Sequence, residues 1–249
     1  MTIKGITYSD IRMTKSAVLC EDSMFENAVD DTSCYSYGDI LSDFNSDNYS
    51  VLSREFGVGL YIWKPYIINH SLRNLDDGDI LIYSDAGVEF INSVHHIIDR
   101  MDQDIWLFGN MFEHEHWCKK ECLDMMNMGY YWRHKDGRPF PGKQVQASVI
   151  FIHVSPFSRK FIKEWLLWCQ MPGCIETECD PAIQHPQFKE HRWDQAILTN
   201  LAIKHDIKLH YWPASYNNGA FEYDPVGYDR SVDNYPILFN HHRRRNNEW

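Results

Sequence analysis

Gly78-Asp79-Ile80-Leu81-Ile82-Tyr83-Ser84-Asp85-Ala86-Gly87 is the most informative stretch of the sequence. Its continuous apolar run ends in a small, polar turn, which predicts a buried strand of a parallel or mixed sheet. Asp85 closes that strand, and Ala86-Gly87 allow a ligand to come close to the backbone. A carboxylate in this place can hold a hard divalent cation through its oxygens. The alternative is an aspartate that only forms a turn after a strand, which is common.

Apolar runs and helically spaced apolar residues alternate on both sides of this stretch, which predicts an α/β layered fold. Further strands are expected at 3–9, 104–109, 147–154 and 208–212. Helices are expected at 65–75, 94–101, 117–128, 156–168 and 193–201. Loops rich in Gly or Pro are expected at 137–142 and 171–186, and functional loops of such folds lie at the carboxyl ends of the strands. The polar first 50 residues carry weaker signals, with a short helix or loop at 39–48.

The chain has 249 residues, of which 44% are hydrophobic, so it can bury a sizeable core. We expect one domain over residues 1–249. Lys and Arg total 24 while Asp and Glu total 35, which gives a formal net charge of −11. This acidity argues against a nucleic-acid binder, which needs a basic surface to neutralise phosphates. A small phosphate-bearing ligand is still compatible, because a metal ion or a few local cations can neutralise it.

The cellular compartment of the protein is predicted from the lack of two kinds of segment, a membrane helix and an apolar leader, and from the number of cysteines. No apolar run approaches the ~18 residues of a membrane helix, and residues 1–10 contain no apolar leader. The seven cysteines are an odd number, which indicates reduced thiols that pack as small hydrophobes. Cys118, Cys122, Cys174 and Cys179 could instead form a zinc site, but their spacing is poor for one. We therefore expect a cytoplasmic protein without a transmembrane segment.

Two motifs resemble those of a known family. Ile62-Trp63-Lys64-Pro65-Tyr66-Ile67-Ile68 and the 78–87 stretch are similar to motifs of small glycosyltransferases with the nucleotide-diphospho-sugar, or GT-A, fold. Weaker matches follow in the family's order, at 115–119, 144–148, 191–195 and 240–243. The resemblance spans residues 37–243 and implies a mixed, mostly parallel sheet flanked by helices.

The resemblance implies a hexosyl- or pentosyltransferase that moves a sugar from a UDP- or GDP-sugar donor to a glycan or glycoprotein acceptor. The N-terminal part would bind the nucleotide-sugar and the C-terminal part the acceptor. Such enzymes build surface polysaccharides or glycoprotein glycans, which suggests the cytosol of a bacterium or of a virus-infected host cell. This assignment rests on the resemblance and not on the composition.

The resemblance also implies Mn²⁺ or Mg²⁺ on the donor diphosphate, held in GT-A enzymes by an Asp-x-Asp segment at a strand end. This chain has Asp85-Ala86-Gly87 there, so Asp85 is the one metal ligand carried over from the motif. A C-terminal histidine completes the metal shell in many such enzymes. His241 and His242 both match its position, and the sequence does not choose between them.

Asp194 is the candidate catalytic residue. It lies in the first turn of a predicted helix, where a carboxylate is also favoured simply by the helix dipole. In the functional interpretation it is a base that deprotonates the acceptor hydroxyl, which gives inversion, or a ligand of a sugar hydroxyl. Gln195 could hydrogen-bond the sugar.

Further residues are candidates for binding the donor. Lys64 and, with weaker support, Arg54 could contact the phosphates, although either could be a surface charge. Arg243 begins a basic run that could neutralise the diphosphate or be a solvated tail. Thr7 and Tyr8 on the first strand are candidate contacts of the base, and Ser84 precedes the metal-ligand candidate in its motif.

Two other functions are compatible with the sequence. A metal-dependent phosphoester hydrolase would use Asp85 with some of the 13 histidines, but it usually needs more ligand clusters to hold two metals. A non-catalytic carbohydrate-binding protein would use the nine Trp and 14 Tyr to stack on sugar rings. Glu113-His114-Glu115-His116 looks like a set of metal ligands, but neighbouring residues there face different ways, so we assign it to an acceptor loop or the polar surface.

Overall fold

The computed structural model describes residues 1–130, 142–216, 221–222 and 233–249. Its main sheet has the strand order β2-β1-β3-β6-β5-β7. The strands are β1 (Ile3–Tyr8), β2 (Asp31–Tyr35), β3 (Ile80–Ser84), β5 (Ile105–Glu113), β6 (Lys143–His153) and β7 (Leu209–His210). Only β6 runs antiparallel to its neighbours among these strands. The predicted α/β fold with a mixed, mostly parallel sheet is therefore confirmed.

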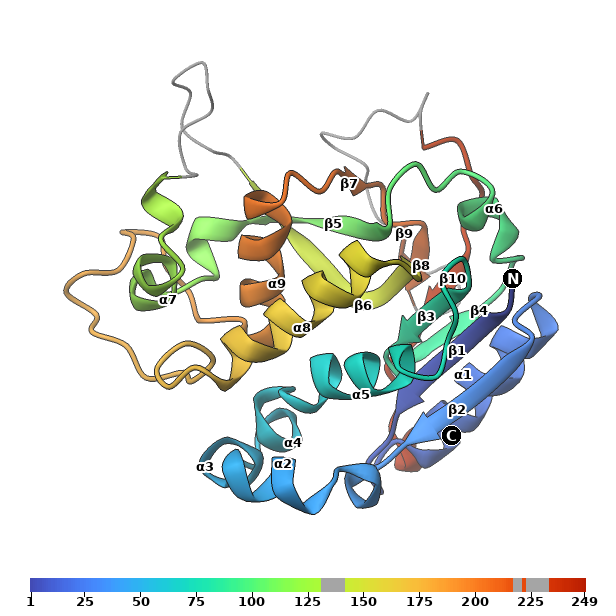
Figure 1. Cartoon of the computed structure of the whole chain (residues 1–249), viewed down its shortest axis with the longest axis horizontal. Helices are drawn as coiled ribbons and strands as arrows, with labels where there is room; N and C mark the ends of the chain where they lie inside the picture. Colours follow the sequence, from blue (N-terminus) through green and yellow to red (C-terminus); the bar gives the residue numbers. More distant parts are fainter. Residues whose placement is uncertain (131–141, 217–220, 223–232) are drawn as a thin grey trace.

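Three helices pack on one face of this sheet (Figure 1): α5 (Trp63–Leu72), α8 (Pro156–Gln170) and α9 (Trp193–Lys204). Side chains of a strand point alternately to its two faces. In β3, Leu81 and Tyr83 accordingly join the core under these helices, while Ile80 and Ile82 join a second core on the other face.

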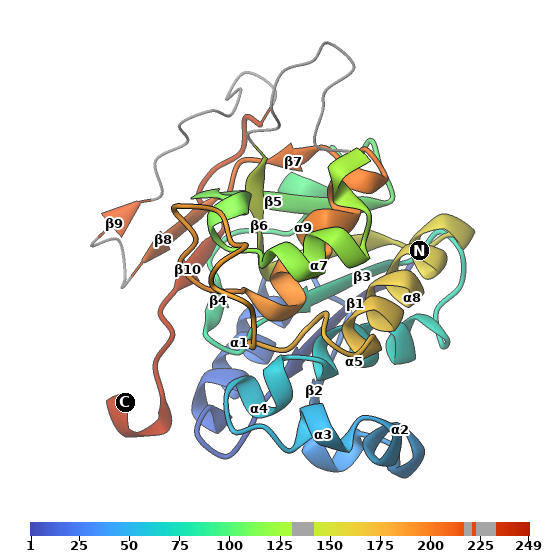
Figure 2. The ribbon, with the colours of Figure 1, turned by 90° about the vertical axis from the view of Figure 1, so that its left-hand side faces the viewer.

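The second core lies between the main sheet, helix α1 (Thr14–Glu26) and a smaller sheet. The smaller sheet has the order β4-β10-β8-β9 and is seen on the left of Figure 2. Its strands are β4 (Val88–Phe90), β8 (Ala214–Tyr216), β9 (Phe221–Glu222) and β10 (Phe239–His241). Because β10 pairs with β4, the C-terminal segment runs beside the turn that follows β3.

The remaining elements are short. They are α2 (Ser42–Asp47), α3 (Tyr49–Leu52), α4 (Gly57–Leu60), α6 (His95–Ile98), α7 (Lys120–Met125) and the 3-10 turns η1 (Tyr37–Asp39), η2 (His114–His116), η3 (Met128–Tyr130) and η4 (Asn246–Glu248). Within the described ranges, no helix is long and apolar enough to cross a membrane.

Two predicted helices are wrong in length. The helix expected at 117–128 is α7, which covers only its middle, and that expected at 94–101 is the single turn α6. Side chains from the 171–192 segment explain the late start of α7. His191 accepts a hydrogen bond from the Lys119 amide, and Gln184 accepts one from the Lys120 amide. Of the loop expected at 137–142, only Gly142 lies within the described residues.

Helix α8 begins at Pro156, where the helix expected at 156–168 also begins, and two serines cap this end. Ser155 Oγ accepts a hydrogen bond from the Ser158 amide at 3.1 Å, and Ser158 Oγ accepts one from the Ser155 amide at 2.9 Å. These two bonds satisfy amides that the first turn of a helix leaves without a backbone partner.

We predict that Ser155→Ala lowers the free energy of unfolding by about 1 kcal/mol, because it removes this cap. Urea denaturation at neutral pH measures the change. Ser42→Ala, at an exposed position of α2 that caps no helix, is the matched control and should change stability little. Equal effects of the two substitutions would show that the cap does not stabilise α8.

Candidate active site

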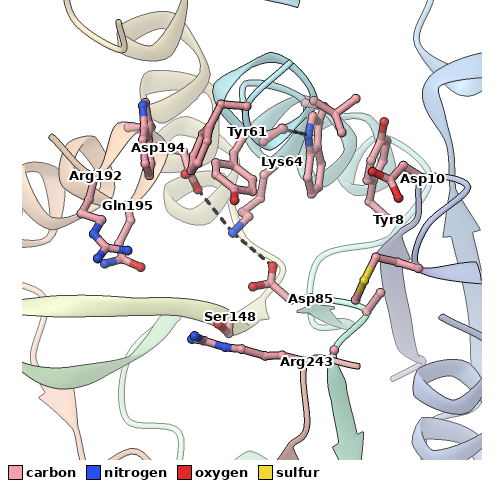
Figure 3. A pocket seen from close by; sticks show the side chains of 18 of the residues that line it. Tyr8, Asp10, Tyr61, Lys64, Asp85, Ser148, Arg192, Asp194, Gln195 and Arg243 are labelled. Atoms are coloured by element: carbon pink, nitrogen blue, oxygen red, sulfur yellow. Dashed lines mark hydrogen bonds and ion pairs between the residues drawn. The ribbon is translucent and has the colours of Figure 1, made fainter. Parts of the chain in front are cut away.

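A cleft of about 890 Å³ opens at the carboxyl end of the parallel strands, where ligands of open α/β sheets bind. Tyr8 at the end of β1 and Asp85 after β3 lie on its floor, and the first turn of α9 forms one wall with Asp194. Figure 3 shows these side chains pointing toward a common space, with Lys64 of α5 reaching between the two carboxylates.

Lys64 joins the two aspartates. Its Nζ forms ion pairs with Asp85 Oδ1 at 3.2 Å and Asp194 Oδ2 at 3.4 Å, and it donates a hydrogen bond to the Ala147 carbonyl oxygen at 3.1 Å. Lys64 and Asp194 are only 4% and 3% exposed. The buried ammonium is therefore compensated by two carboxylates and one carbonyl oxygen, as a buried charge requires.

The three charges shift one another's pKa values. Burial raises the pKa of Asp194 to about 6, and the charge of Asp85 adds to this while Lys64 opposes it. Burial also acts on Asp85, but Lys64 and a 2.5 Å hydrogen bond from the Tyr83 hydroxyl outweigh it and hold that pKa below its usual value. For Lys64, burial is outweighed by Asp194 and Asp85, so its pKa is raised. Two carboxylates whose pKa values are driven apart in one cleft are typical of an acid or base site.

The segment before α5 is a left-handed turn. Five consecutive residues, Gly57 to Tyr61, have positive φ angles, of 58°, 50°, 91°, 52° and 63°. This conformation costs about 1–2 kcal/mol for each non-glycine residue, and such strain concentrates at functional sites. Hydrogen bonds hold it, among them one from the Gly59 amide to the Arg54 carbonyl oxygen at 2.8 Å and one from Trp63 Nε1 to the Gly57 carbonyl oxygen at 3.0 Å.

This turn places aromatic rings along the cleft. Tyr8 stacks on Trp63 with ring centroids 3.8 Å apart, and burial raises the pKa of Tyr8 to about 12. Phe56, which is 55% exposed, packs against Trp193 with centroids 4.3 Å apart. Tyr8 and Trp63 are each 5% exposed, so Phe56 is the ring of these that presents exposed apolar surface beside the charged centre, a combination that suits bases and sugar rings.

The C-terminal segment closes the cleft opposite Lys64. The Arg243 amide donates to the Gly87 carbonyl oxygen at 3.0 Å, and Arg243 Nε donates to His241 Nε2 at 3.0 Å. His241 is 3% exposed, and burial lowers its pKa to about 3. Figure 3 shows Arg243 across the cleft from Lys64 and Asp194.

The predicted site residues divide into two groups. Seven of the candidates line the cleft: Tyr8, Lys64, Asp85, Asp194, Gln195, His241 and Arg243. Four do not line it: Thr7, Arg54, Ser84 and His242. Thr7 and Ser84 are fully buried, Arg54 forms an ion pair with Glu178 at 3.0 Å, and His242 packs against Trp249.

Sequence reasoning did not single out several residues of the cleft. Asp10 and Arg12 form an ion pair at its β1 side, and Arg192 lies over the Trp117 ring at 4.4 Å. Tyr83 belongs to the 78–87 motif, but no role was predicted for it. Its place two residues before Asp85 puts both on one face of the strand, and this spacing could have shown the contact.

Two other clusters of metal-ligating side chains lie outside the cleft. Within the described ranges, Glu115, His116 and His185 are the one group with metal-ligand separations, and its histidine Nε2 atoms lie 3.8 and 3.5 Å from Glu115 Oε1. The Gln187 amide donates to His185 Nδ1, so the ring proton is on Nε2 and faces the carboxylate. The thiols of Cys122 and Cys174 are buried in contact at 3.4 Å and are not part of this group.

The structure is similar to solved glycosyltransferases. It matches the bifunctional glycosyltransferase WbbM with a TM-score of 0.53 at 10% identity, over 97% of this chain and 46% of that one. The chain has the GT-A fold. It also matches the galactosyltransferase LgtC, solved with donor and acceptor sugar analogues, with a TM-score of 0.49 at 16% identity over 97% and 87% of the two chains. A glycosyltransferase of the major capsid of PBCV-1 matches with a TM-score of 0.48 at 10% identity over 97% and 92%.

The comparisons with known proteins establish the fold of this chain, and they establish neither its family nor its substrate. The chain spans less than half the length of the WbbM chain. No protein-family model and no curated protein matches the sequence. The chemistry of this GT-A chain must therefore be argued from its own residues.

We predict that Lys64→Met lowers the free energy of unfolding by about 3 kcal/mol at about pH 8, because the buried Asp194 and the partly exposed Asp85 lose their common counter-charge. The loss should be smaller at about pH 5, where a carboxyl with the raised pKa of Asp194 binds a proton and needs no partner. Urea denaturation at the two pH values measures both quantities.

Lys160→Met is the control, since Lys160 lies exposed on α8. It should change stability little at either pH. A loss for Lys64→Met that is the same at both pH values would contradict the proposed charge arrangement.

Proposed function

We propose that this protein is a glycosyltransferase that moves a hexose or pentose from a UDP- or GDP-sugar to a glycan or glycoprotein acceptor. The observation that carries the proposal is the Lys64 bridge, which fixes two carboxylates of different pKa in the cleft of a GT-A fold. Cytoplasmic action in polysaccharide or glycoprotein glycan synthesis stays a prediction from the sequence.

The cleft offers separate places for the parts of a nucleotide-sugar. The aromatic pair Tyr8 and Trp63 at the β1 side suits the base, and Arg243 suits the diphosphate. The donor sugar would then lie near Asp85, which is 36% exposed, with that surface available to the cleft. Arg192 and Gln195 are on the other side of Asp194 from Tyr8 in Figure 3, so we assign that side to the acceptor.

Asp194 is the proposed base. With a pKa of about 6 it is ionised at neutral pH and yet basic enough to take a proton from an acceptor hydroxyl. The hydroxyl oxygen attacks the anomeric carbon, the carbon–oxygen bond to the diphosphate breaks, and the nucleoside diphosphate leaves with that electron pair. Lys64 keeps the base in place and keeps its pKa from rising further.

The sequence resemblance implies Mn²⁺ or Mg²⁺, with Asp85 and His241 or His242 as ligands. The residues present do not fit such a site well. Asp85 Oδ1 already accepts from Tyr83 and Lys64, His241 Nε2 accepts from Arg243, and His242 is outside the cleft lining. One carboxylate oxygen is a poor ligand set for a hard cation. The steps above therefore use the chain's own residues only.

A direct test is to incubate the protein with a panel of UDP- and GDP-sugars and measure the release of nucleoside diphosphate. Release that increases when a sugar acceptor is added supports the proposal. Phosphate release from simple phosphoesters, without any response to a nucleotide-sugar, would instead support the hydrolase interpretation.

We predict that Asp194→Asn lowers turnover by about 100-fold or more while donor affinity stays close to that of the unchanged protein, because the substitution removes a base and not a donor contact. Turnover is measured by nucleoside diphosphate release and affinity by calorimetry. Asp102→Asn, at an exposed position outside the cleft lining, is the control and should leave both values unchanged. Unchanged turnover in Asp194→Asn would remove Asp194 from the mechanism.

A further inference from the structure

The position of the missing second carboxylate is occupied by another part of the chain. In the triplet Asp85-Ala86-Gly87, a Cβ atom at Gly87 would lie 2.9 Å from the Arg243 Cα and 3.3 Å from its amide nitrogen. Contacts this close to backbone atoms are not tolerated without a shift. A side chain of any kind is therefore excluded at residue 87 in this arrangement, and an arginine of the C-terminal segment lies against it.

The contact between Arg243 and His241 fixes the position of the imidazole proton. A guanidinium can only donate hydrogen bonds, so the 3.0 Å contact from Arg243 Nε makes His241 Nε2 the acceptor. The proton of the neutral ring is then on Nδ1. A protonated Nδ1 cannot ligate a metal, but it can donate to an anion.

His241 Nδ1 has no hydrogen-bond partner in the part of the chain that the structure describes. The atom is buried, and His241 is one of the residues that line the cleft. Buried donors are almost always paired, so an unpaired one at a cleft points to an acceptor atom on a ligand.

Arg243 offers further donors at the same place. Its guanidinium is exposed in the cleft, and its two terminal NH₂ groups make no hydrogen bond with the residues that the structure describes. The planar fork of these groups matches two oxygens of a phosphate. Lys64 is different, because it already forms ion pairs with Asp85 and Asp194 and donates to the Ala147 carbonyl oxygen.

We propose that Arg243 and the Nδ1–H of His241 bind the diphosphate of the nucleotide-sugar, so that binding requires no divalent cation. This inference rests on the proposed function and adds the recognition of the donor to it. Arg243 also meets the negative charge that develops on the departing nucleoside diphosphate, which is the role a cation has in such transfers. Lys64 has a positioning role, since its charge offsets one of the two negative charges of Asp85 and Asp194 that would otherwise both repel the donor.

Calorimetric titration of the full chain with UDP and with GDP tests the inference. Affinity for one of them should be the same with excess EDTA as with added Mn²⁺ or Mg²⁺. In EDTA, Arg243→Gln should weaken binding by about tenfold or more, the value of a lost charge-assisted hydrogen bond. His241→Phe should also weaken binding, because it removes the Nδ1–H donor and keeps a ring of similar shape.

Arg73→Gln is the matched control, since Arg73 is exposed at the end of α5, and it should bind as the unchanged protein does. Circular dichroism of each variant checks that the fold is kept. Binding that needs Mn²⁺ and disappears in EDTA would overturn the inference and leave the proposed function in place. Undiminished binding by the Arg243 variant would also overturn it. Failure of both nucleotides to bind under any of these conditions would contradict the proposed function as well.

Discussion

The buried ammonium of Lys64 is the interaction on which the cleft depends. It lies at the start of α5 and contacts the end of β3, the middle of β6 and the first turn of α9 through Asp85, Ala147 and Asp194. A lysine is rarely buried without full compensation, because removing the charge from water is costly. Here three oxygens compensate it, so these four elements are fixed relative to one another by their polar groups as well as by the apolar core.

The same lysine gives the two carboxylates different properties. Lys64 and the Tyr83 hydroxyl together stabilise the ionised form of Asp85. For Asp194 the effect of burial is larger than that of Lys64, so the pKa of Asp194 is raised to about 6. Asp85 therefore has a pKa below its usual value, while Asp194 can accept a proton near neutral pH. The left-handed turn from Gly57 to Tyr61 precedes Lys64 and lines the same cleft, which gives a reason to retain a strained backbone there.

Much of the fold could be predicted from the sequence, because its buried strands are continuous apolar runs. The run before Asp85 and the run from Val149 to Ile152 in β6 have no polar interruption that would suggest another structure. Helix α1 could not be predicted in this way. Its buried face consists of Ser16, Ala17, Cys20, Ser23 and Met24, which are mostly small or polar and give little contrast with the exposed face.

Site residues could be predicted where they lie at the end of a strand, as Asp85 does, or in the first turn of a helix, as Asp194 does. The contacts of Arg243 were not, because they depend on the pairing of β10 with β4 across 151 positions of the chain, as between Asn240 and Glu89. The net charge of −11 was also a poor guide to the cleft. Five cationic residues line it against four carboxylates: Arg12, Lys64, Arg192, Arg243 and Arg245 against Asp10, Glu55, Asp85 and Asp194.

Lys64 and burial drive the pKa values of the two carboxylates apart, so that Asp85 titrates below the ordinary aspartate value and Asp194 titrates near neutrality. Carbon-13 NMR of the aspartate carboxyl groups, followed across pH, measures this directly. The account predicts one carboxyl that titrates at a pH of about 6, whose signal is absent in Asp194→Asn, while Asp85 titrates below the ordinary aspartate value. Ordinary titration of both carboxyls, with no resonance that changes near neutral pH, would contradict it.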